Sequence, residues 1–526
     1  MKRIVASVLL AAIMLLNVIA MASCGPKETP DIDGMKQEIA KAGWQVPAEG
    51  YDGSAVTITF WHTMSQTKLQ PTLELYIQEF NKLYPNITVD HSSPGSYDDV
   101  LDQVKTSLTA GNEPNIAYCY PDHVASYLNA MKVVPLDNLI NSQIPVTDAQ
   151  GNTTILGLTE EQKADFVPGY YAEGAVFDQA GTMYTLPMSK STEALYYNKT
   201  FFEDNNLTVP TTWDEMEAVC AAIKAIDPDC IPLGYDSEAN WFITMCMQYG
   251  GADLYTKLDA NKDYFKFDNP TTREFVERFK RWYDLGYFTT EELYGSYTSG
   301  LFTNTTANND NGTPDDPSDD ITQRCYMVIG STGGASYQTP PTNNEGFSIF
   351  ETAMTTIPQV DPAKPQVISQ GPSLCIFKKA NPQEVVASWL FVEFLTTNAD
   401  FQAEFSKISG YAPVIQSVQN NEDYANWLNS AKGEVTQAVD ENGQPVFVDG
   451  EPVLIDANLT AMSVKLALSQ ANAYYVSPAF NGSSEARKQV GLIMVNVFGS
   501  TRTDIKALIE EEFSRAMGEC KYAVNN

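Results

Sequence analysis

Basic residues and histidine are scarce in this chain of 526 residues. It has 33 Lys and Arg against 66 Asp and Glu, which gives a formal net charge of -33, and only three His. Binding to a nucleic-acid backbone requires clustered Lys and Arg, so the composition argues against a nucleic-acid partner. It also disfavours adhesion of the protein surface to anionic lipid. The acidic residues are spread along the chain, as expected for a solvated surface.

Catalytic signatures are lacking as well. The sequence has no Gly-x-Ser-x-Gly, no His-Glu-x-x-His and no phosphate-binding P-loop. None of His62, His91 and His123 stands at motif spacing from a Cys or a carboxylate. A glycosidase needs two carboxylates placed across a sugar, and no such pair is singled out here. We therefore expect neither an enzyme nor a bound cofactor or metal, with a surface glycan hydrolase and a structural or adhesive lipoprotein as the alternatives.

A long hydrophobic run occurs only at the N-terminus, where residues 4–20 follow Lys2 and Arg3. This pattern predicts a signal peptide over residues 1–23 and an extracytoplasmic protein. Small residues before Cys24 resemble a bacterial lipobox, with Met21 in place of the usual Leu, which implies acylation of Cys24. Cleavage after Ala22 is the alternative. Residues 24–54 would then be the lipid anchor and tether to the membrane.

Cysteine pairs at metal-binding or redox spacing are absent, since no Cys-x-x-Cys occurs. Seven cysteines remain after Cys24. Cys220 and Cys230 could form a disulfide in an exported protein, because they lie ten residues apart around a short helix and loop. Burial as small hydrophobic side chains is the other interpretation. The odd number allows no disulfide framework to be deduced.

Strand and helix patterns alternate in the first half of the chain. Residues 56–60 alternate as in a strand, 69–84 have apolar residues at helical spacing, and 87–89 form the next strand. Residues 100–108 and 116–119 repeat the order, which predicts an α/β fold with parallel strands. Later helical patterns are expected at 216–226, 241–249, 272–285, 388–397, 486–497 and 505–517.

Three short motifs follow one another in a fixed order. They are Gly181-x-x-Tyr184-x-x-Pro187, then Tyr-Tyr-Asn-Lys at 196–199, then Pro-x-Thr-Trp-Asp-Glu at 210–215. Tyr-Pro-Asn-Ile at 84–87 and Gly-Asn-x-Pro at 111–114 add to the pattern. This order resembles the extracellular solute-binding proteins of ABC importers, sugar-binding family 1.

The resemblance implies a two-lobed periplasmic-binding-protein fold, in which each lobe is a mostly parallel sheet flanked by helices and a multi-strand hinge joins the lobes. Lobe 1 would comprise 55–190 and 372–412, and lobe 2 would comprise 191–371 and 413–526. The implied function is capture of a small sugar or polyol-phosphate ligand by a monomer, which delivers it to an ABC permease in the membrane.

An acidic stretch at 304–320 does not fit this pattern. Its carboxylates beside Gly and turn residues could bind Ca²⁺, although the spacing is not that of an EF-hand. A solvated surface insert is the other interpretation.

Loops after the predicted strands supply the candidate ligand-binding residues, because open α/β sheets bind ligands beyond the carboxyl ends of their strands. Aromatic rings and hydroxyl groups at these loops suit a polyol, whose C–H faces stack on rings while its hydroxyls form hydrogen bonds. Core packing is the alternative for each aromatic residue. The candidates are Trp61, Tyr97, Asp122, Ser191, Thr192, Trp241, Ser331, Thr332, Gly371 and Tyr411.

Within the family, these positions are most similar to those of the glycerol-3-phosphate-binding members. The similarity adds Arg487, which would hold a phosphate through two hydrogen bonds. It is weakest at the acidic contact to the glycerol hydroxyls, where Pro121 or Asp122 falls. The sequence therefore leaves a carbohydrate and a glycerol-phosphate compound as alternative ligands.

Overall fold

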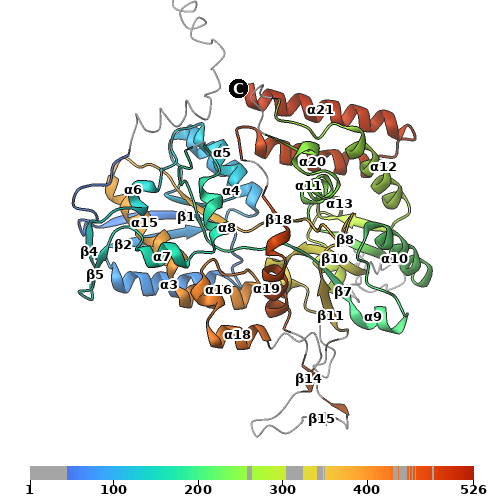
Figure 1. Ribbon diagram of the computed structural model, residues 1–526, viewed down its shortest axis with the longest axis horizontal. Coiled ribbons are helices and arrows are strands. Elements are labelled where there is room, and N and C mark those ends of the chain that lie inside the picture. The colour runs from blue at the N-terminus through green and yellow to red at the C-terminus, as the bar shows by residue number, and fades with distance from the viewer. Residues whose placement is uncertain are drawn as a thin grey trace, which may run out of the picture.

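The computed structural model describes residues 44–178, 180–257, 263–303, 324–340, 348, 350–429, 458–476 and 479–525, with four short strand pieces between 430 and 457. The predicted signal peptide, Cys24, most of the tether and the acidic stretch at 304–320 lie outside the described residues. Among the described helices, none combines the length and the apolar character that a membrane span needs. Two sheets, each flanked by helices, lie side by side (Figure 1).

The first sheet has the strand order β2-β1-β3-β13-β6. β2 and β3 both pair in parallel with β1, whereas β13 pairs antiparallel with β3 and β6. The predicted strand-helix-strand order at the start of the chain is therefore confirmed. The elements of this lobe are β1 Val56–Trp61, α3 Gln70–Leu83, β2 Ile87–Ser92, α4 Tyr97–Ala110, β3 Ile116–Cys119, β6 Leu186–Pro187, β13 Ser373–Ile376 and α15 Pro382–Thr397.

Local sequence fixes the helix that leads into the future site. Ser96 caps α4, since its side chain accepts a hydrogen bond from the Asp99 amide and the Asp99 side chain accepts one from the Ser96 amide. Val100, Leu101 and Val104 form the buried face. The helix ends at Gly111, whose φ of +77° is the left-handed conformation typical of a helix C-terminus.

The second sheet has the order β11-β7-β10-β8-β9. β10, β8 and β9 are parallel, and β7 runs antiparallel to both β10 and β11. Both sheets are therefore mixed, with the parallel strands grouped on one side. The elements of this lobe are β7 Glu193–Asn198, α10 Trp213–Ile226, β8 Ile231–Tyr235, α11 Glu238–Tyr249, α12 Pro270–Asp284, β9 Phe288–Thr290, β10 Cys325–Ser331, β11 Thr352–Thr355, α20 Ser483–Phe498 and α21 Ile505–Asn525.

Shorter elements connect these parts. They are α5 Pro121–Leu128, α6 Asp137–Ile140, β4 Pro145–Thr147, β5 Thr153–Ile155, α7 Glu160–Asp165, α8 Pro168–Ala172, α9 Lys199–Asp204, α13 Glu291–Tyr294, α14 Ser299–Thr303, η3 Thr332–Tyr337, β12 Val367–Ile368, α16 Ala399–Ser409, α17 Gln416–Gln419, α18 Glu422–Asn429, α19 Leu459–Ser469 and β18 Tyr474–Tyr475.

Several chain segments cross between the two lobes. Lys190 pairs with Ala412 and Ser191 pairs with Gln370 in antiparallel bridges, and β12 pairs with β18. These pairings form the expected multi-strand connection.

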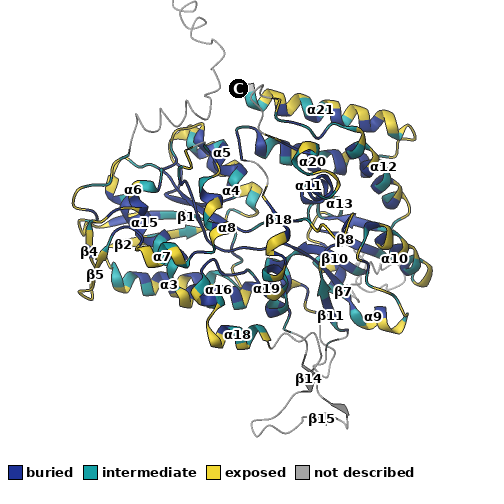
Figure 2. Ribbon diagram, viewed as in Figure 1, coloured by how far each residue is buried: buried dark blue, intermediate teal, exposed yellow. Residues whose placement is uncertain are grey.

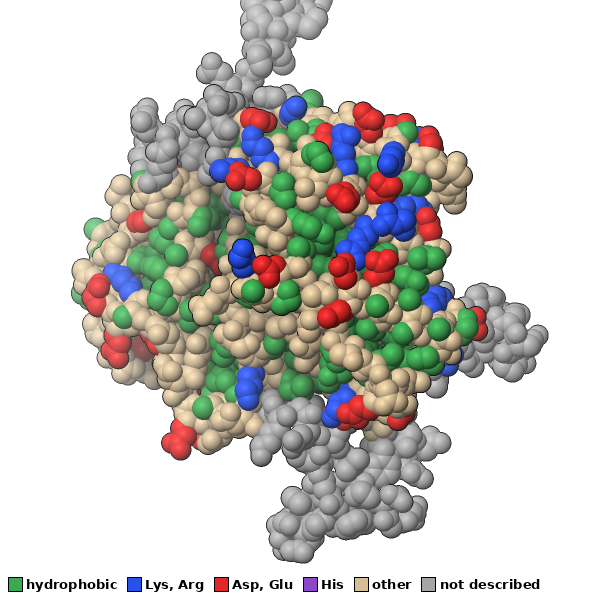
Figure 3. Space-filling model, turned by 45° about the vertical axis from the view of Figure 1, so that its right-hand side comes forward, with side chains coloured by type: hydrophobic (Ala, Val, Ile, Leu, Met, Phe, Trp, Pro, Cys, Tyr) green, Lys and Arg blue, Asp and Glu red, His purple; other side chains and the backbone are tan. Residues whose placement is uncertain are grey.

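Separate hydrophobic cores stabilise the two lobes, as the buried sheets in Figure 2 show. The first-lobe core packs β1 against α15, where the buried Trp389 Nε1 donates a 2.7 Å hydrogen bond to the Leu156 carbonyl. This core continues beyond residue 412 through Val414, Val418 and Tyr424. All seven cysteines in the described part are free and buried, Cys220 and Cys230 among them. On the face drawn in Figure 3, basic side chains lie among acidic ones.

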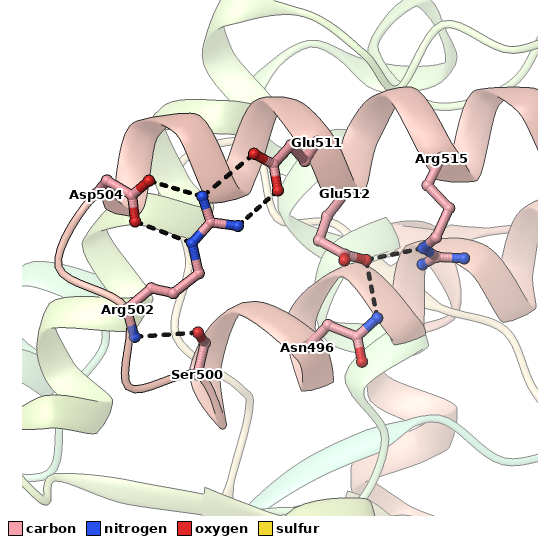
Figure 4. Close-up of polar contacts among 7 residues, drawn as sticks. All are labelled: Asn496, Ser500, Arg502, Asp504, Glu511, Glu512 and Arg515. Carbon is pink, nitrogen blue, oxygen red and sulfur yellow. Dashed lines mark hydrogen bonds and ion pairs between the residues drawn. The ribbon is translucent and has the colours of Figure 1, made fainter.

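Asn496 of α20 donates to Glu512 of α21 at the surface, and Arg502 holds the loop between these helices to the start of α21 (Figure 4). Its guanidinium donates to both carboxylate oxygens of Asp504, at 2.9 and 2.7 Å, and also reaches Glu511. These hydrogen bonds lower the pKa of Asp504 to about 2. Beneath them, Phe513 of α21 is fully buried in the second-lobe core.

We expect Phe513→Ala to lower the free energy of unfolding by about 3–5 kcal/mol, because it leaves a cavity among aromatic side chains. Arg502→Ala should leave the urea unfolding midpoint nearly unchanged, because its ion pairs are exposed to water and screened by salt. Urea unfolding of both variants, followed by circular dichroism, checks the contrast. A large loss of stability for Arg502→Ala would contradict it.

Candidate functional site

A cleft of about 880 Å³ lies between the two lobes. Loops that follow the carboxyl ends of β1, β2, β3, β8 and β9 line it, as expected for open α/β sheets. The start of β7 also reaches it, because this strand is antiparallel to β10. The lining residues from these loops include 63–65, 95–98, Tyr120, 236–240, Glu291 and Glu292.

Three tyrosines form the first-lobe wall of the cleft. The ring of Tyr97 stacks on that of Tyr120 with centroids 4.5 Å apart, and lies nearly parallel to that of Tyr118 at 6.4 Å. The hydroxyls of Tyr97 and Tyr411 are 3.5 Å apart. Tyr411 packs closely over Gly333, where a Cβ atom would lie 2.4 Å from the ring. This close approach requires glycine at position 333.

Arg487 extends from α20 towards the tyrosine wall. Its Nη2 donates to Asn240 Oδ1, and its guanidinium carbon lies 5.9 Å from the centre of the Tyr120 ring. Burial lowers the pKa of Arg487, but Asp122 and the other neighbouring acidic groups, Asp98 among them, together outweigh this effect and keep the pKa above its ordinary value. Arg487 is therefore a fixed positive charge that the second lobe presents to the first.

Carboxylates outnumber basic side chains in the cleft, with nine Asp and Glu against Lys105, Arg487 and Lys488. The first lobe contributes Asp98, Asp102 and Asp122, and the second lobe contributes Glu193, Asp236, Glu238, Glu291, Glu292 and Glu485. Among the described residues, no group of acidic, His or Cys side chains is arranged to hold a metal ion.

Hydrogen bonds fix the second-lobe carboxylates. Asp236 Oδ1 accepts from the amide and the hydroxyl of Thr298, at 2.7 and 2.6 Å. Glu193 Oε2 accepts from the Tyr235 hydroxyl at 2.9 Å, and Glu238 Oε1 accepts from the Glu292 amide at 3.1 Å. These side chains therefore keep their places without a ligand.

Burial raises the pKa of three of these carboxyls. It raises the pKa of Glu193 to about 7 and that of Asp236 to about 6. Burial, followed by repulsion from Asp236, Glu238, Glu292 and Asp98, raises the pKa of Glu291 to about 8. Asp98 belongs to the opposite lobe, so like charges face each other across the cleft.

Several cleft-lining residues have a buried polar atom with no hydrogen-bond partner within the described part of the protein. Such atoms are costly unless a ligand or water satisfies them. They are Ser65 Oγ, Tyr118 OH, Asp122 Oδ2, His123 Nδ1, Ser189 Oγ and Gln338 Oε1.

The structure brings five of the predicted site residues to the cleft and places five elsewhere. Tyr97, Asp122, Ser331, Tyr411 and Arg487 line it. Gly371 lines a small adjoining cavity together with Asp122 and Arg487. Its φ is +105° and a Cβ atom would lie 2.3 Å from the Ser189 carbonyl oxygen, so the backbone there requires glycine. The remaining five, Trp61, Ser191, Thr192, Trp241 and Thr332, are outside the lining set.

Packing explains the position of these five residues. Trp61 is half-buried against a first-lobe core. Ser191 and Thr192 lie in the buried crossing, where Thr192 Oγ1 donates to the Ile368 carbonyl at 2.7 Å and the Thr192 amide donates to Thr332 Oγ1 at 3.0 Å. Trp241 is fully buried among aromatic rings, with Tyr235 stacked on it at 4.7 Å.

The carboxylates of the second lobe were missed by the sequence reasoning. Asp236 and Glu238 directly follow β8, and Glu291 directly follows β9, so the strand-end rule identifies them once these strands are assigned. The rule does not identify Glu193, because this residue begins an antiparallel strand and does not follow the end of a parallel one.

The lobes also touch at the rim of the cleft. Lys68 Nζ donates to the Ser336 carbonyl at 3.2 Å and lies 4.0 Å from the centre of the Tyr337 ring. At another point, Asn129 Nδ2 donates to Asn481 Oδ1 at 2.7 Å. In this conformation the two lobes are therefore in direct contact at the rim.

Comparison with known proteins identifies the family. The family model described as bacterial extracellular solute-binding protein matches residues 76–431, more than half of the chain. The protein belongs to this family. Its members bind solutes outside the cytoplasm, so the expected extracytoplasmic location and solute-binding role are confirmed.

Relatives and solved structures extend the comparison. The sn-glycerol-3-phosphate-binding periplasmic protein UgpB of Escherichia coli (strain K12) is 23% identical over 375 residues, which cover 69% of this chain and 75% of the relative. UgpB of Salmonella typhimurium is 23% identical over 372 residues, with the same coverage.

Solved structures of low identity share the fold. UgpB from Mycobacterium tuberculosis, in complex with glycerophosphocholine, matches with a TM-score of 0.62 and 16% identity, over 89% of this chain and 99% of that chain. Maltose-bound MalE3 of T. maritima matches with a TM-score of 0.61 and 15% identity, over 88% and 100%. The two-lobed α/β fold predicted from the sequence is thereby confirmed.

We expect stability without ligand to fall as the pH rises from about 4.5 to 7. In that window Glu193 keeps its proton in the folded state, where its pKa is about 7, but loses it in the unfolded state, where its pKa is near the ordinary 4.5 of a glutamate. The folded state then binds more protons, so the free energy of unfolding decreases with pH. Glu193→Gln should reduce this slope, whereas Glu274→Gln on the exposed face of α12 should not. Urea unfolding midpoints at pH 5, 6, 7 and 8 test this, and equal slopes in both variants would contradict it.

Proposed function

We propose that the protein is the substrate-binding component of an ABC importer and that it captures a carbohydrate or a glycerophosphoryl compound. The observation that carries this proposal is the tyrosine wall of the cleft, with Arg487 facing it from the other lobe. Membership of the solute-binding family and similarity to proteins named for glycerol-3-phosphate support the ligand class.

The cleft walls suit a ligand with hydroxyl groups. The faces of Tyr97 and Tyr120 can stack against C–H groups of a sugar or glycerol frame. The Tyr118 hydroxyl and Asp122 Oδ2 have no hydrogen-bond partner among the described residues, and ligand hydroxyls can satisfy them. An apolar guest would leave them unpaired, which is costly.

Arg487 is the residue that would bind a phosphate group. Its planar guanidinium can donate two parallel hydrogen bonds to phosphate oxygens. One of its nitrogens already donates to Asn240, which orients the group. Ser331, Gly371 and Tyr411 complete the proposed ligand contacts around it. With a carbohydrate, the same donors would bind ring hydroxyls.

Lobe closure is the proposed mechanism of capture. The ligand contacts both Tyr97 and Arg487 only when the lobes are together, so it shifts the population towards the closed form. The halves expected from the sequence are 55–190 with 372–412 and 191–371 with 413–526. We propose that the segment from Val414 to Tyr424 moves with the first half, because it packs in the first-lobe core. The closed monomer would then dock on the membrane permease and release the ligand unchanged, without catalysis.

The proposed anchor places this capture at the membrane surface. Acyl chains on Cys24, followed by the tether at 24–54, would hold the protein beside its permease. One chain binds membranes only marginally, whereas the several chains of a bacterial lipoprotein give stable attachment.

Arg487→Ala should weaken binding of glycerol-3-phosphate about 10–100-fold, because a charge-assisted pair of hydrogen bonds contributes about 1.5–3 kcal/mol. Tyr97→Ala should weaken both sugar and glycerophosphoryl ligands, because it removes a stacking face common to them. Isothermal titration calorimetry measures both effects. Arg502→Ala is the matched control, since this arginine lies outside the cleft lining and should leave affinity unchanged.

Unchanged affinity of Arg487→Ala for glycerol-3-phosphate would contradict the phosphate role. A thermal-shift panel of sugars, polyols and glycerophosphoryl compounds tests the broader proposal. No stabilisation by any of them, or conversion of a bound glycan into products, would contradict ligand capture without chemistry.

Cys24→Ala should move the protein from the membrane fraction to the soluble fraction and abolish incorporation of labelled palmitate. Cys220→Ala is the control, because Cys220 is buried in the second-lobe core and cannot be an N-terminal acylation site. Membrane retention and labelling that survive in Cys24→Ala would contradict the anchor. A wild-type protein found unlabelled in the soluble fraction would also contradict it, and would favour cleavage after Ala22.

A further inference from the structure

Carboxyl groups in the cleft outnumber the basic side chains, and six of the nine would still be charged if Glu193, Asp236 and Glu291 kept their protons. Arg487 already faces Asp122 and donates to Asn240, yet carboxylates outnumber basic side chains three to one among the lining residues. A ligand that carries only a phosphate would add to this excess of negative charge. The charge balance therefore favours a ligand that also carries a positive charge.

The unbalanced carboxylates gather at the ends of β8 and β9. Asp236 Oδ1 is held by Thr298, and its other oxygen lies against Gly330, where a Cβ atom would be 2.8 Å away. Glu291 and Glu292 begin α13, and the Glu292 amide donates to Glu238. Asp98 lies near this group from the first lobe, and Tyr297 beside it is 57% exposed.

Buried hydrogen-bond acceptors independently indicate that the ligand carries a donor group. Asp122 Oδ2 and Gln338 Oε1 belong to cleft-lining side chains that are 8% and 2% exposed. Neither oxygen has a hydrogen-bond partner within the described residues. Both atoms are acceptors, so the group that satisfies them must be a donor, as a hydroxyl or an ammonium group is.

The rings around the cleft already contact cations of the protein itself. Lys68 Nζ lies 4.0 Å above the centre of the Tyr337 ring, and Arg487 lies over Tyr120. Tyr97, Tyr297 and Tyr411 line the same space. Tyrosine faces beside carboxylates are a favourable environment for an ammonium group.

We infer that the ligand carries an ammonium group on a hydroxyl-bearing frame, and that Asp236, Glu238 and Glu291 bind this group while Arg487 and the tyrosine wall bind the rest. This inference rests on the proposed function, because it names the ligand class for the same cleft. The frame can be an amino sugar or a glycerophosphoryl ester of an amino alcohol.

Two matched pairs of compounds test it by calorimetry at pH 6.5. Glucosamine is compared with glucose, and glycerophosphoethanolamine, whose ammonium group donates hydrogen bonds, with glycerophosphoglycerol, a phosphodiester of the same phosphate charge that lacks the ammonium group. We expect at least one ammonium-bearing compound to bind about tenfold or more tightly than its partner. The pair that shows the difference identifies the frame.

Substitutions of the carboxylates then test where in the cleft the ammonium group binds. Glu291→Gln and Asp236→Asn should each weaken the preferred ammonium compound about tenfold and leave its partner nearly unchanged. Glu274→Gln, on the exposed face of α12, is the matched control for loss of one negative charge. Urea unfolding of each variant shows whether it is folded.

The number of protons released on binding is a further test, because it would not change if Glu291 only stabilised the fold. A cation beside Glu291 should displace the proton that burial and the neighbouring carboxylates favour there. Binding enthalpies measured in PIPES and in ACES buffer should therefore differ by the number of protons released times the difference between the ionisation enthalpies of the two buffers, and Glu291→Gln should reduce that difference.

The outcomes separate the inference from the proposed function. If a test compound or a member of the panel binds but neither ammonium-bearing compound binds more tightly than its partner, the inference is overturned and the proposed function stands. Equal loss of both partners in Glu291→Gln would also overturn it. If none of the four compounds and no member of the thermal-shift panel binds, the proposed function fails and the inference with it.

Discussion

Backbone hydrogen bonds between the crossing segments are the constraint on which the cleft depends. The Lys190 amide and carbonyl pair with Ala412, and those of Ser191 pair with Gln370, at 2.6–3.0 Å. Gly371 lets the chain pass within contact of the Ser189 carbonyl. Because these pairings hold the two sheets beside each other, the strand ends of both lobes open onto one space. The tyrosines of one lobe then face Arg487 of the other.

Two opposing electrostatic features meet in that space. Arg487 is a permanent positive charge beside aromatic rings, whereas the loops after β8 and β9 concentrate carboxylates whose burial raises their pKa. In the empty cleft, closure brings Asp98 towards the second-lobe carboxylates. Ligand charge and lobe closure are therefore coupled, since any group placed between them changes the repulsion that closure must overcome.

Much of the fold could be predicted from the sequence, because local patterns specify it. Alternation at the first strand, the apolar face of the next helix and the Tyr-Tyr-Asn-Lys motif all correspond to observed elements. The placement of side chains was harder to predict. Tyr97 and Arg487 reach the cleft, whereas Trp241 turns into the core, because the helix face on which it lies packs against Phe279 and Phe288. The sequence indicated that Trp241 lies near the end of a strand, but not whether its ring points into the cleft or into the core. Glu193 shows another limit: only the antiparallel pairing of β7 brings the start of a strand to the ligand side.

The distribution of indole side chains has a practical consequence for spectroscopy. Trp213, Trp241, Trp282 and Trp389 are all buried in the hydrophobic cores, and no tryptophan is among the described residues that line the cleft. Intrinsic fluorescence excited at indole wavelengths will therefore follow the integrity of the two cores and respond little to occupancy. A single tryptophan introduced at the rim of the cleft would supply the missing optical reporter.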